Sequence, residues 1–448
     1  MQAAPLPETG VTVVGAGLAG SEAALVLSAA GIRVDLVEMR PGASTPAHRT
    51  GWFAELVCSN SLGSEELESG KGLLKEELRL LGSNLLRLAE PARVPAGKAL
   101  AVDRDAFGRA VTAAVLSRPT VRVIEREETS IPDAPLVILA CGPLPSEALS
   151  SSIRSLLGDG GYYFYDAISP IVDASTIDMD SGFFADRYGA GARDYLNLPM
   201  TREQYEVFLS ALLSARVVPP REFEEERYFE SCMPIETIAR RGPETLLFGP
   251  MRPVGLRDPR TGKIPHAVVQ LRKENAAGTM LNLVGFQTKL AYPEQERVFS
   301  LIPGLSGAKF LRYGSVHRNS FLDARRHLHP WLECRRRPGL FFAGQITGVE
   351  GYVESIAAGF VAAVSAAAIA AGGEPPRFPE ASMTGSLVRH ITSPRPGDFQ
   401  PMNANFGLLP TSAPGRKRER KARQAAAALS AIEEFRRSFF KFNPLCVT

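Results

Sequence analysis

The sequence is poor in the residue types that mark disulfide-bonded, metal-rich or secreted proteins. Its 448 residues include five cysteines, an odd number scattered without a CxxC pair, and this excludes a disulfide framework. Only six histidines are present. The opening MQAAPLPETG lacks the basic and apolar regions of a signal peptide. We therefore expect a cytoplasmic protein with free thiols.

Long hydrophobic runs and a strong net charge are also lacking. The Ala-rich run from Ile356 to Ala371 is interpreted as too short and too weakly apolar to cross a bilayer, so no membrane contact is expected. Lys and Arg exceed Asp and Glu by only 51 to 48, but residues 415–441 carry nine Lys or Arg against three Glu. This stretch predicts a basic C-terminal helix, which is either a solvated face or a contact to a nucleic-acid backbone.

Residues 11–38 form the most informative segment. An apolar run, Val11 to Val14, is followed by the glycine-rich GAGLAG, an apolar-periodic helix and a second β-branched run that ends at Glu38. In such a strand–turn–helix–strand unit the glycines permit a tight turn, backbone approach to a pyrophosphate and close helix packing, while the acid accepts a ribose hydroxyl. The segment predicts a site for FAD or NAD.

The rest of the chain predicts a doubly wound α/β domain with an insertion. Residues 1–150 and 286–448 are assigned to an FAD-binding domain, which resumes with a strand near 281–286, and residues 151–285 to an inserted α+β domain. We expect helices over 71–81, 84–89, 103–116 and 202–214, and short strands over 121–124, 136–140, 160–165, 228–233, 246–248 and 339–343. The Pro-rich segment 377–412 is expected to wrap the surface.

Two later turns support FAD over NAD. Ala140-Cys141-Gly142 is similar to the alanine–threonine–glycine turn of flavoproteins with two dinucleotide folds, and Leu340 to Gln345 resembles their late strand-end motif. The helix that begins near Tyr352 would direct its positive end at the flavin. The expected cofactor-binding residues are Gly15, Ala16, Gly17, Leu18, Ala19, Gly20, Glu38, Gly142, Gly344, Gln345, Tyr352 and Val353.

Two cysteine-containing segments narrow the family. Ala54-Glu-Leu-Val-Cys58-Ser-Asn-Ser-Leu-Gly63 and Tyr228-Phe-Glu-Ser-Cys232-Met-Pro-Ile-Glu236 resemble signature segments of the folate- and FAD-dependent tRNA (uracil-5-)-methyltransferases. Gly344 to Tyr352 and His317-Arg-Asn319 fit the same family, and the resemblance covers essentially the whole chain. The related glucose-inhibited division protein A family, which modifies wobble uridine, is the alternative, together with another FAD oxidoreductase.

The resemblance implies methylation of a T-loop uridine, position 54, at C5 of the base. It implies 5,10-methylenetetrahydrofolate as carbon donor, reduced FAD as reductant, and NADPH or NADH to reduce the flavin again. The inserted domain is expected to contact tRNA. His317 and Arg318 are candidate folate or phosphate contacts.

Uracil C5 becomes nucleophilic once a thiolate adds to C6, so a cysteine is the natural catalyst. Cys232 is the first candidate for that nucleophile, and Cys58 is the candidate for removing the C5 proton or contacting the flavin. Cys141, Cys334 and Cys446 are expected to be structural. His327, His329 and Cys334 are too few donors to predict a metal, and none is expected.

Overall fold

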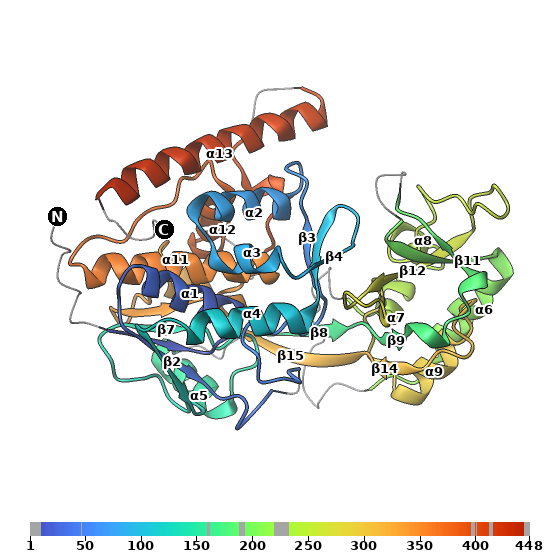
Figure 1. Cartoon of the computed structure of the whole chain (residues 1–448), viewed down its shortest axis with the longest axis horizontal. Helices are drawn as coiled ribbons and strands as arrows, with labels where there is room; N and C mark the ends of the chain where they lie inside the picture. The colour runs from blue at the N-terminus through green and yellow to red at the C-terminus, as the bar shows by residue number, and fades with distance from the viewer. Residues whose placement is uncertain are drawn as a thin grey trace.

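The chain folds into two lobes joined by a pair of long strands (Figure 1). The structure, a computed structural model, describes residues 10–45, 47–158, 162–187, 193–218, 233–395, 399, 401–411 and 415–442. The first lobe contains both ends of the described chain, and the second is built from its middle.

A five-stranded parallel sheet forms the centre of the first lobe, in the order β16-β7-β1-β2-β6. These strands are β1 (Val11–Val14), β2 (Val34–Glu38), β6 (Val121–Glu125), β7 (Val137–Leu139) and β16 (Leu340–Phe342). All four pairings are parallel. The strand order reverses between β1 and β7. In open α/β sheets, such a reversal leaves a crevice at the carboxyl ends of the strands, and ligands bind there. The predicted doubly wound fold is confirmed.

Helices cover this sheet and pack on one another. They are α1 (Leu18–Ala29), α2 (Gly70–Leu81), α3 (Asn84–Ala89), α4 (Arg104–Leu116), α5 (Glu147–Leu157) and α11 (Tyr352–Ala370). The expected helices over 71–81, 84–89 and 103–116 match α2, α3 and α4 to within one residue, and Asp103 caps α4 by accepting from the Ala106 amide.

Helix α11 corrects one expectation. With 19 residues and a mean hydropathy of 1.8 in its most apolar window, it is long and apolar enough to span a bilayer, contrary to the interpretation of residues 356–371. However, 89% of that window is buried inside the protein. Its composition therefore reflects a core position, in which it packs against α1 and against β7 and β16 of the sheet.

A six-stranded antiparallel sheet forms the second lobe, in the order β10-β11-β12-β13-β9-β14. Its strands are β9 (Ile171–Asp173), β10 (Phe183–Phe184), β11 (Tyr195–Met200), β12 (Ala267–Lys273), β13 (Met280–Leu283) and β14 (Phe310–Arg312). The helices of this lobe are α6 (Arg202–Ser214), α7 (Ile235–Ala239), α8 (Thr245–Phe248) and α9 (Tyr292–Phe299). Helix α6 matches the helix expected over 202–214.

Two expectations in this lobe are wrong. The strand near 281–286 does not return to the parallel sheet, because β13 pairs with β12 and β9. Residues 246–248 form a helical turn rather than a strand: Leu246 is fully buried, whereas Phe248 is 80% exposed, although a strand would point both side chains to one face. The expected strand over 228–233 lies almost entirely outside the described residues.

Strands β8 (Tyr162–Ile168) and β15 (Ser315–Phe321) pair antiparallel between the lobes (Figure 1). A small antiparallel sheet, β3 (Ser61–Ser64), β5 (Ala99–Val102) and β4 (Arg93–Val94), lies on the first lobe. The remaining short elements are α10 (Ala324–His327) and the 3₁₀ turns Ala174–Thr176, Met179–Ser181, Gln345–Thr347 and Phe406–Leu408.

The C-terminal part returns to the first lobe. Residues 377–412 do not simply wrap the surface, because they include α12 (Met383–Thr392), whose Met383, Leu387 and Ile391 are buried at helical spacing. The expected basic helix is α13 (Lys417–Phe442), which lies across α2 (Figure 1).

Helix α12 is held by a buried carboxylate of α2. Glu77 accepts hydrogen bonds from the Met383 amide (2.6 Å) and from the amide and hydroxyl of Thr384 (both 2.8 Å). Burial outweighs these hydrogen bonds and raises the pKa of Glu77 to about 7. Because the folded state then binds more protons than the unfolded state between about pH 4.5 and 7, the contribution of Glu77 to stability falls as pH rises through this range.

We predict that Glu77→Gln lowers the free energy of unfolding most at pH 5, and that the gap to wild type narrows by up to about 3 kcal/mol by pH 8. Urea unfolding across this pH range measures the gap. Glu147→Gln, at a glutamate that is 83% exposed, is the control and should show no such trend. A gap for Glu77→Gln that is independent of pH contradicts the prediction.

Candidate functional site

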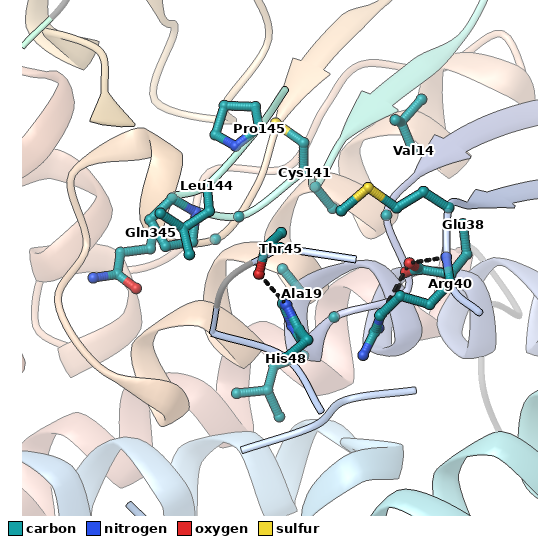
Figure 2. Close-up of a pocket in the computed structure, with 18 of the residues that line it drawn as sticks. Val14, Ala19, Glu38, Arg40, Thr45, His48, Cys141, Leu144, Pro145 and Gln345 are labelled. Carbon is teal, nitrogen blue, oxygen red and sulfur yellow. Dashed lines mark hydrogen bonds and ion pairs between the residues drawn. The ribbon is translucent and has the colours of Figure 1, made fainter. Parts of the chain in front are cut away.

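Three glycine-containing turns meet at the carboxyl ends of β1, β7 and β16, which are neighbours in the sheet. The residues that line the cavity between them include Gly15, Gly17, Leu18, Ala19, Glu38, Cys141, Gly142, Gly344, Gln345 and Tyr352. Figure 2 shows Ala19, Glu38, Cys141 and Gln345 around this space. The structure therefore brings together the three motifs that the sequence placed more than a hundred residues apart.

The glycines of the first turn have different surroundings. A Cβ on Gly20 would lie 1.8 Å from the Gly15 carbonyl oxygen, so Gly20 is required for packing α1 against the turn. A Cβ on Gly17 would meet no atom within 4 Å. Gly17 is the N-cap of α1 and provides no side-chain cap, so the first amides of the helix stay available to an anion. This open cradle fits the pyrophosphate of a dinucleotide such as FAD.

Glu38 is already engaged within the protein. Its carboxylate accepts from the Ala16 amide (2.7 Å), the Arg40 amide (3.0 Å), and Nε and Nη2 of Arg40 (3.0 and 3.2 Å). Burial opposes ionisation, but the Arg40 guanidinium and these amides outweigh it and hold the pKa of Glu38 below its ordinary value. Glu38 is therefore a carboxylate at neutral pH, and a ribose hydroxyl would share it with Arg40.

Some expected cofactor residues do not line the cavity. Ala16 lies behind it and orients Glu38, Gly20 is a packing residue, and Val353 is buried in the core with 1% exposure. The sequence did not indicate the loop residues Thr45 and His48, which do line it and are joined by a hydrogen bond of 2.6 Å (Figure 2). No motif marks these two, because they come from an irregular loop.

Cys58 lies beside the cavity and contacts Tyr352, the first residue of α11. The Tyr352 hydroxyl accepts from the backbone amides of Cys58 (2.8 Å) and Ser59 (3.0 Å), and its oxygen is 2.9 Å from Cys58 Sγ. Two amides occupy the acceptor positions of the phenol, so its single proton is directed at the sulfur. Burial, then the charge of Cys58, raises the pKa of Tyr352 far above its ordinary value. A neutral phenol that donates to Sγ stabilises the Cys58 thiolate.

The other thiols and the histidines differ from Cys58. Burial raises the pKa of the Cys141 thiol to about 12, which keeps it protonated. Cys334 is buried, and His329 stacks on Trp331. Within the described ranges, no group of three His, Cys, Asp or Glu could hold a metal ion. Cys232 and Cys446 lie outside the described residues, as do the side chains of His317 and Arg318.

The turns, the open glycine cradle and the adjacent thiol define a dinucleotide-binding protein of the flavoprotein type. The family model of Glucose inhibited division protein A matches residues 10–374. Two solved structures of Aquifex aeolicus GidA share the fold: the form II crystal has a TM-score of 0.70 at 18% identity and covers 99% of this chain and 75% of that one.

Curated relatives narrow the class. The methylenetetrahydrofolate--tRNA-(uracil-5-)-methyltransferase TrmFO of Sulfurihydrogenibium sp. is 53% identical over 95% of this chain and 97% of its own length. The TrmFO proteins of Enterococcus faecalis and Desulforudis audaxviator are 53% and 55% identical over 94% and 95% of the chain, and 97% of their own lengths. The chain therefore belongs to the TrmFO family of methylenetetrahydrofolate--tRNA-(uracil-5-)-methyltransferases, and the family resemblance drawn from the sequence is confirmed.

We predict that Gly17→Val folds but does not hold FAD, because its side chain enters the open cradle rather than the protein core. The flavin absorbance of the purified variant and its titration with FAD measure the effect, and the melting temperature of the apoprotein checks folding. Gly307→Val, at a second glycine with no atom within 4 Å of its Cβ, is the control and should retain FAD. Normal FAD content in Gly17→Val would place the pyrophosphate elsewhere.

Proposed function

We propose that this protein methylates C5 of the T-loop uridine at position 54 of tRNA, with 5,10-methylenetetrahydrofolate as carbon donor and reduced FAD as reductant. Family membership supports the reaction. The observation that carries it is the hydrogen-bonded Cys58–Tyr352 pair at the edge of a dinucleotide cavity. NADPH or NADH supplies the electrons, and an enzyme with a tRNA substrate works in the cytoplasm.

The residues of the site have separate tasks. The turns at Gly15–Gly20, Gly142 and Gly344–Gln345 bind the cofactor, and the positive end of α11 faces it. When bound, FAD supplies the redox chemistry that converts a methylene group into a methyl group. Cys232 adds to C6 of uracil and makes C5 nucleophilic, and Cys58 removes the proton from C5. Tyr352 holds Cys58 in place and favours its thiolate.

The two lobes have separate roles. We place the cofactor domain in residues 10–168 and 315–442 and the tRNA-contacting domain in residues 169–312. The chain thus returns to the cofactor domain later than the boundary of 285 expected from the sequence. The hydrophobic core of the second lobe supports this, because it includes Phe299 and Leu305. The turns of the first lobe surround the dinucleotide cavity, so the second lobe is free to hold RNA.

Trapping the RNA adduct tests the roles of the thiols. Wild-type protein should form a covalent adduct with tRNA that carries 5-fluorouridine at position 54, because fluorine cannot leave C5 as a cation. Cys232→Ala should form no adduct and lose methyl transfer, yet keep FAD and its reduction by NADPH. Cys58→Ala should lose methyl transfer but still form the adduct. If Cys232→Ala still forms the adduct and Cys58→Ala does not, the roles of the two cysteines are the reverse of those proposed.

Tyr352→Phe tests the hydrogen bond to Cys58. Without the hydroxyl, the thiolate has one donor fewer, so the rise of the methylation rate with pH should move to higher pH while FAD content is unchanged. The measurement is the single-turnover rate of methyl transfer between pH 6 and 10. An unchanged profile would show that the phenol only positions the loop.

The exposed cations at and just before the start of α13 are expected to contact the RNA backbone. Arg418 is 91% exposed, whereas Lys421 donates to the Glu68 carbonyl (2.8 Å) and lies over the Phe406 ring, and is therefore structural. Replacing Arg416, Arg418 and Arg420 by Gln should weaken tRNA binding and lower the slope of log affinity against log salt by roughly 0.7–0.9 for each phosphate that is no longer neutralised. Filter binding at salt concentrations from about 50 to about 300 mM, where affinity for nucleic acid depends strongly on salt, measures this slope. The flavin content of the variant should not change. If the slope is also unchanged, these arginines are only solvated and do not contact the RNA.

A further inference from the structure

The loop that follows Cys58 is one of the places where the second lobe contacts the first. Asn60 Nδ2 donates to the Lys273 carbonyl (2.9 Å), and Arg272 Nε donates to Asn60 Oδ1 (3.1 Å). Arg272 Nη2 also donates to the Ser59 hydroxyl (2.9 Å). The end of β12 is therefore fixed directly beside the thiol.

Two further arginines lie at this contact, one from each lobe: Arg104 is partly buried, with a side chain 17% exposed, and Arg312 is buried. Arg104, at the start of α4, donates through Nη1 to the Leu56 carbonyl (2.9 Å), and its Nε lies 2.8 Å from Glu274. Its Nη2 is buried and has no hydrogen-bond partner among the described residues. Arg312, the last residue of β14, is only 7% exposed, and no carboxylate of the described ranges forms an ion pair with its guanidinium.

The charges at this contact do not balance among the described side chains. Burial, followed by repulsion from Arg104 and Arg49, lowers the pKa of Arg312 to about 10, while Tyr352 and Cys58 oppose the shift only in part. Glu274 is the carboxylate that neutralises Arg104, which leaves Arg312 with no carboxylate partner in the described chain and with its charge offset only in part by Cys58. An isolated buried cation is unfavourable because it loses its hydration, so a bound anion would recover free energy that folding alone does not.

We propose that Arg312 and Arg104 bind a phosphodiester oxygen of the RNA next to the nucleotide that is methylated. This inference rests on the proposed function. Neither arginine lines the dinucleotide cavity, whereas Tyr352, which bonds Cys58, does. Cys58 and Tyr352 act electrostatically on both arginines, so the two cations lie near the thiol, where the proposed function places the uracil. A nucleotide carries its phosphate one sugar away from its base, and a guanidinium binds phosphate oxygens in a fork.

The first experiment separates a ligand site from a structural ion pair. Arg312→Met keeps the volume of the side chain and removes the charge. If the charge of Arg312 is compensated only when a ligand binds, the variant without tRNA should melt about 2–4 °C higher than wild type, because an uncompensated charge has been removed. If instead the chain itself pairs Arg312, the variant should melt lower, and the proposal is overturned.

The second experiment identifies the ligand. Arg312→Met should bind tRNA about tenfold more weakly, with a salt slope smaller by roughly 0.7, the value for one single-strand phosphate. Its KM for 5,10-methylenetetrahydrofolate and its FAD content should equal those of wild type. Arg312→Lys should recover part of the affinity. Arg122→Met, at an arginine that is 71% exposed on the far edge of the parallel sheet, is the matched control and should behave as wild type.

Failure of the phosphate site and failure of the proposed function give different results. If wild-type protein does not methylate tRNA with folate and FAD present, the proposed function fails. If wild type methylates and Arg312→Met raises only the KM of the folate, the arginines bind a folate carboxylate and the RNA assignment is wrong. If kcat falls while affinity for tRNA and folate is unchanged, the site stabilises charge on the reacting base, and the phosphate assignment is again overturned.

Discussion

The close crossing of α1 and α11 is the contact on which the rest of the first lobe depends. A Cβ on Gly359 would lie 2.2 Å from the Ala19 carbonyl oxygen, so the two helices approach to the limit that glycine permits. Both helices are buried along most of their length. Because α1 begins at the phosphate turn and α11 begins at Tyr352, this crossing fixes the distance between the two halves of the cofactor cavity and places the tyrosine next to Cys58.

Buried carboxylates hold α3 and the segment around Ala404 onto this pair. Glu22 of α1 accepts from the Asn84 and Leu85 amides at the start of α3 (3.0 and 2.8 Å), and Glu354 of α11 accepts from the Ala404 amide (3.0 Å). Each satisfies amides that would otherwise lack a partner in the core. Burial raises the pKa of Glu22 to about 7 despite these bonds. The arrangement orders the helices but desolvates carboxylates, a penalty that packing elsewhere must offset.

Local sequence signals explain what could be predicted. The turn at Gly15–Gly20, the strand that ends at Glu38 and the helices α2, α3 and α6 are set by residues close to one another in sequence. Where the outcome depends on distant partners, the prediction is wrong or absent. Residues 280–283 have the pattern of a buried strand, but only pairing with β12 and β9 decides which sheet they join. Tyr352 was expected at the flavin because it begins α11, yet its bond to Cys58 joins residues 294 positions apart, and no local pattern reveals it.

The loop around Cys58 is the place where these constraints combine. Tyr352 fixes its backbone from α11, and Arg272 fixes Ser59 and Asn60 from the second lobe. From α2, the buried Lys75 donates through Nζ to the Leu62 and Gly63 carbonyls (3.2 and 2.6 Å). Burial lowers the pKa of this lysine to about 8, which leaves it mostly charged at neutral pH. Since three elements from both lobes set one short loop, any shift of the second lobe must move the thiol relative to the cofactor cavity. The chemistry at Cys58 is therefore coupled to how the two lobes are docked.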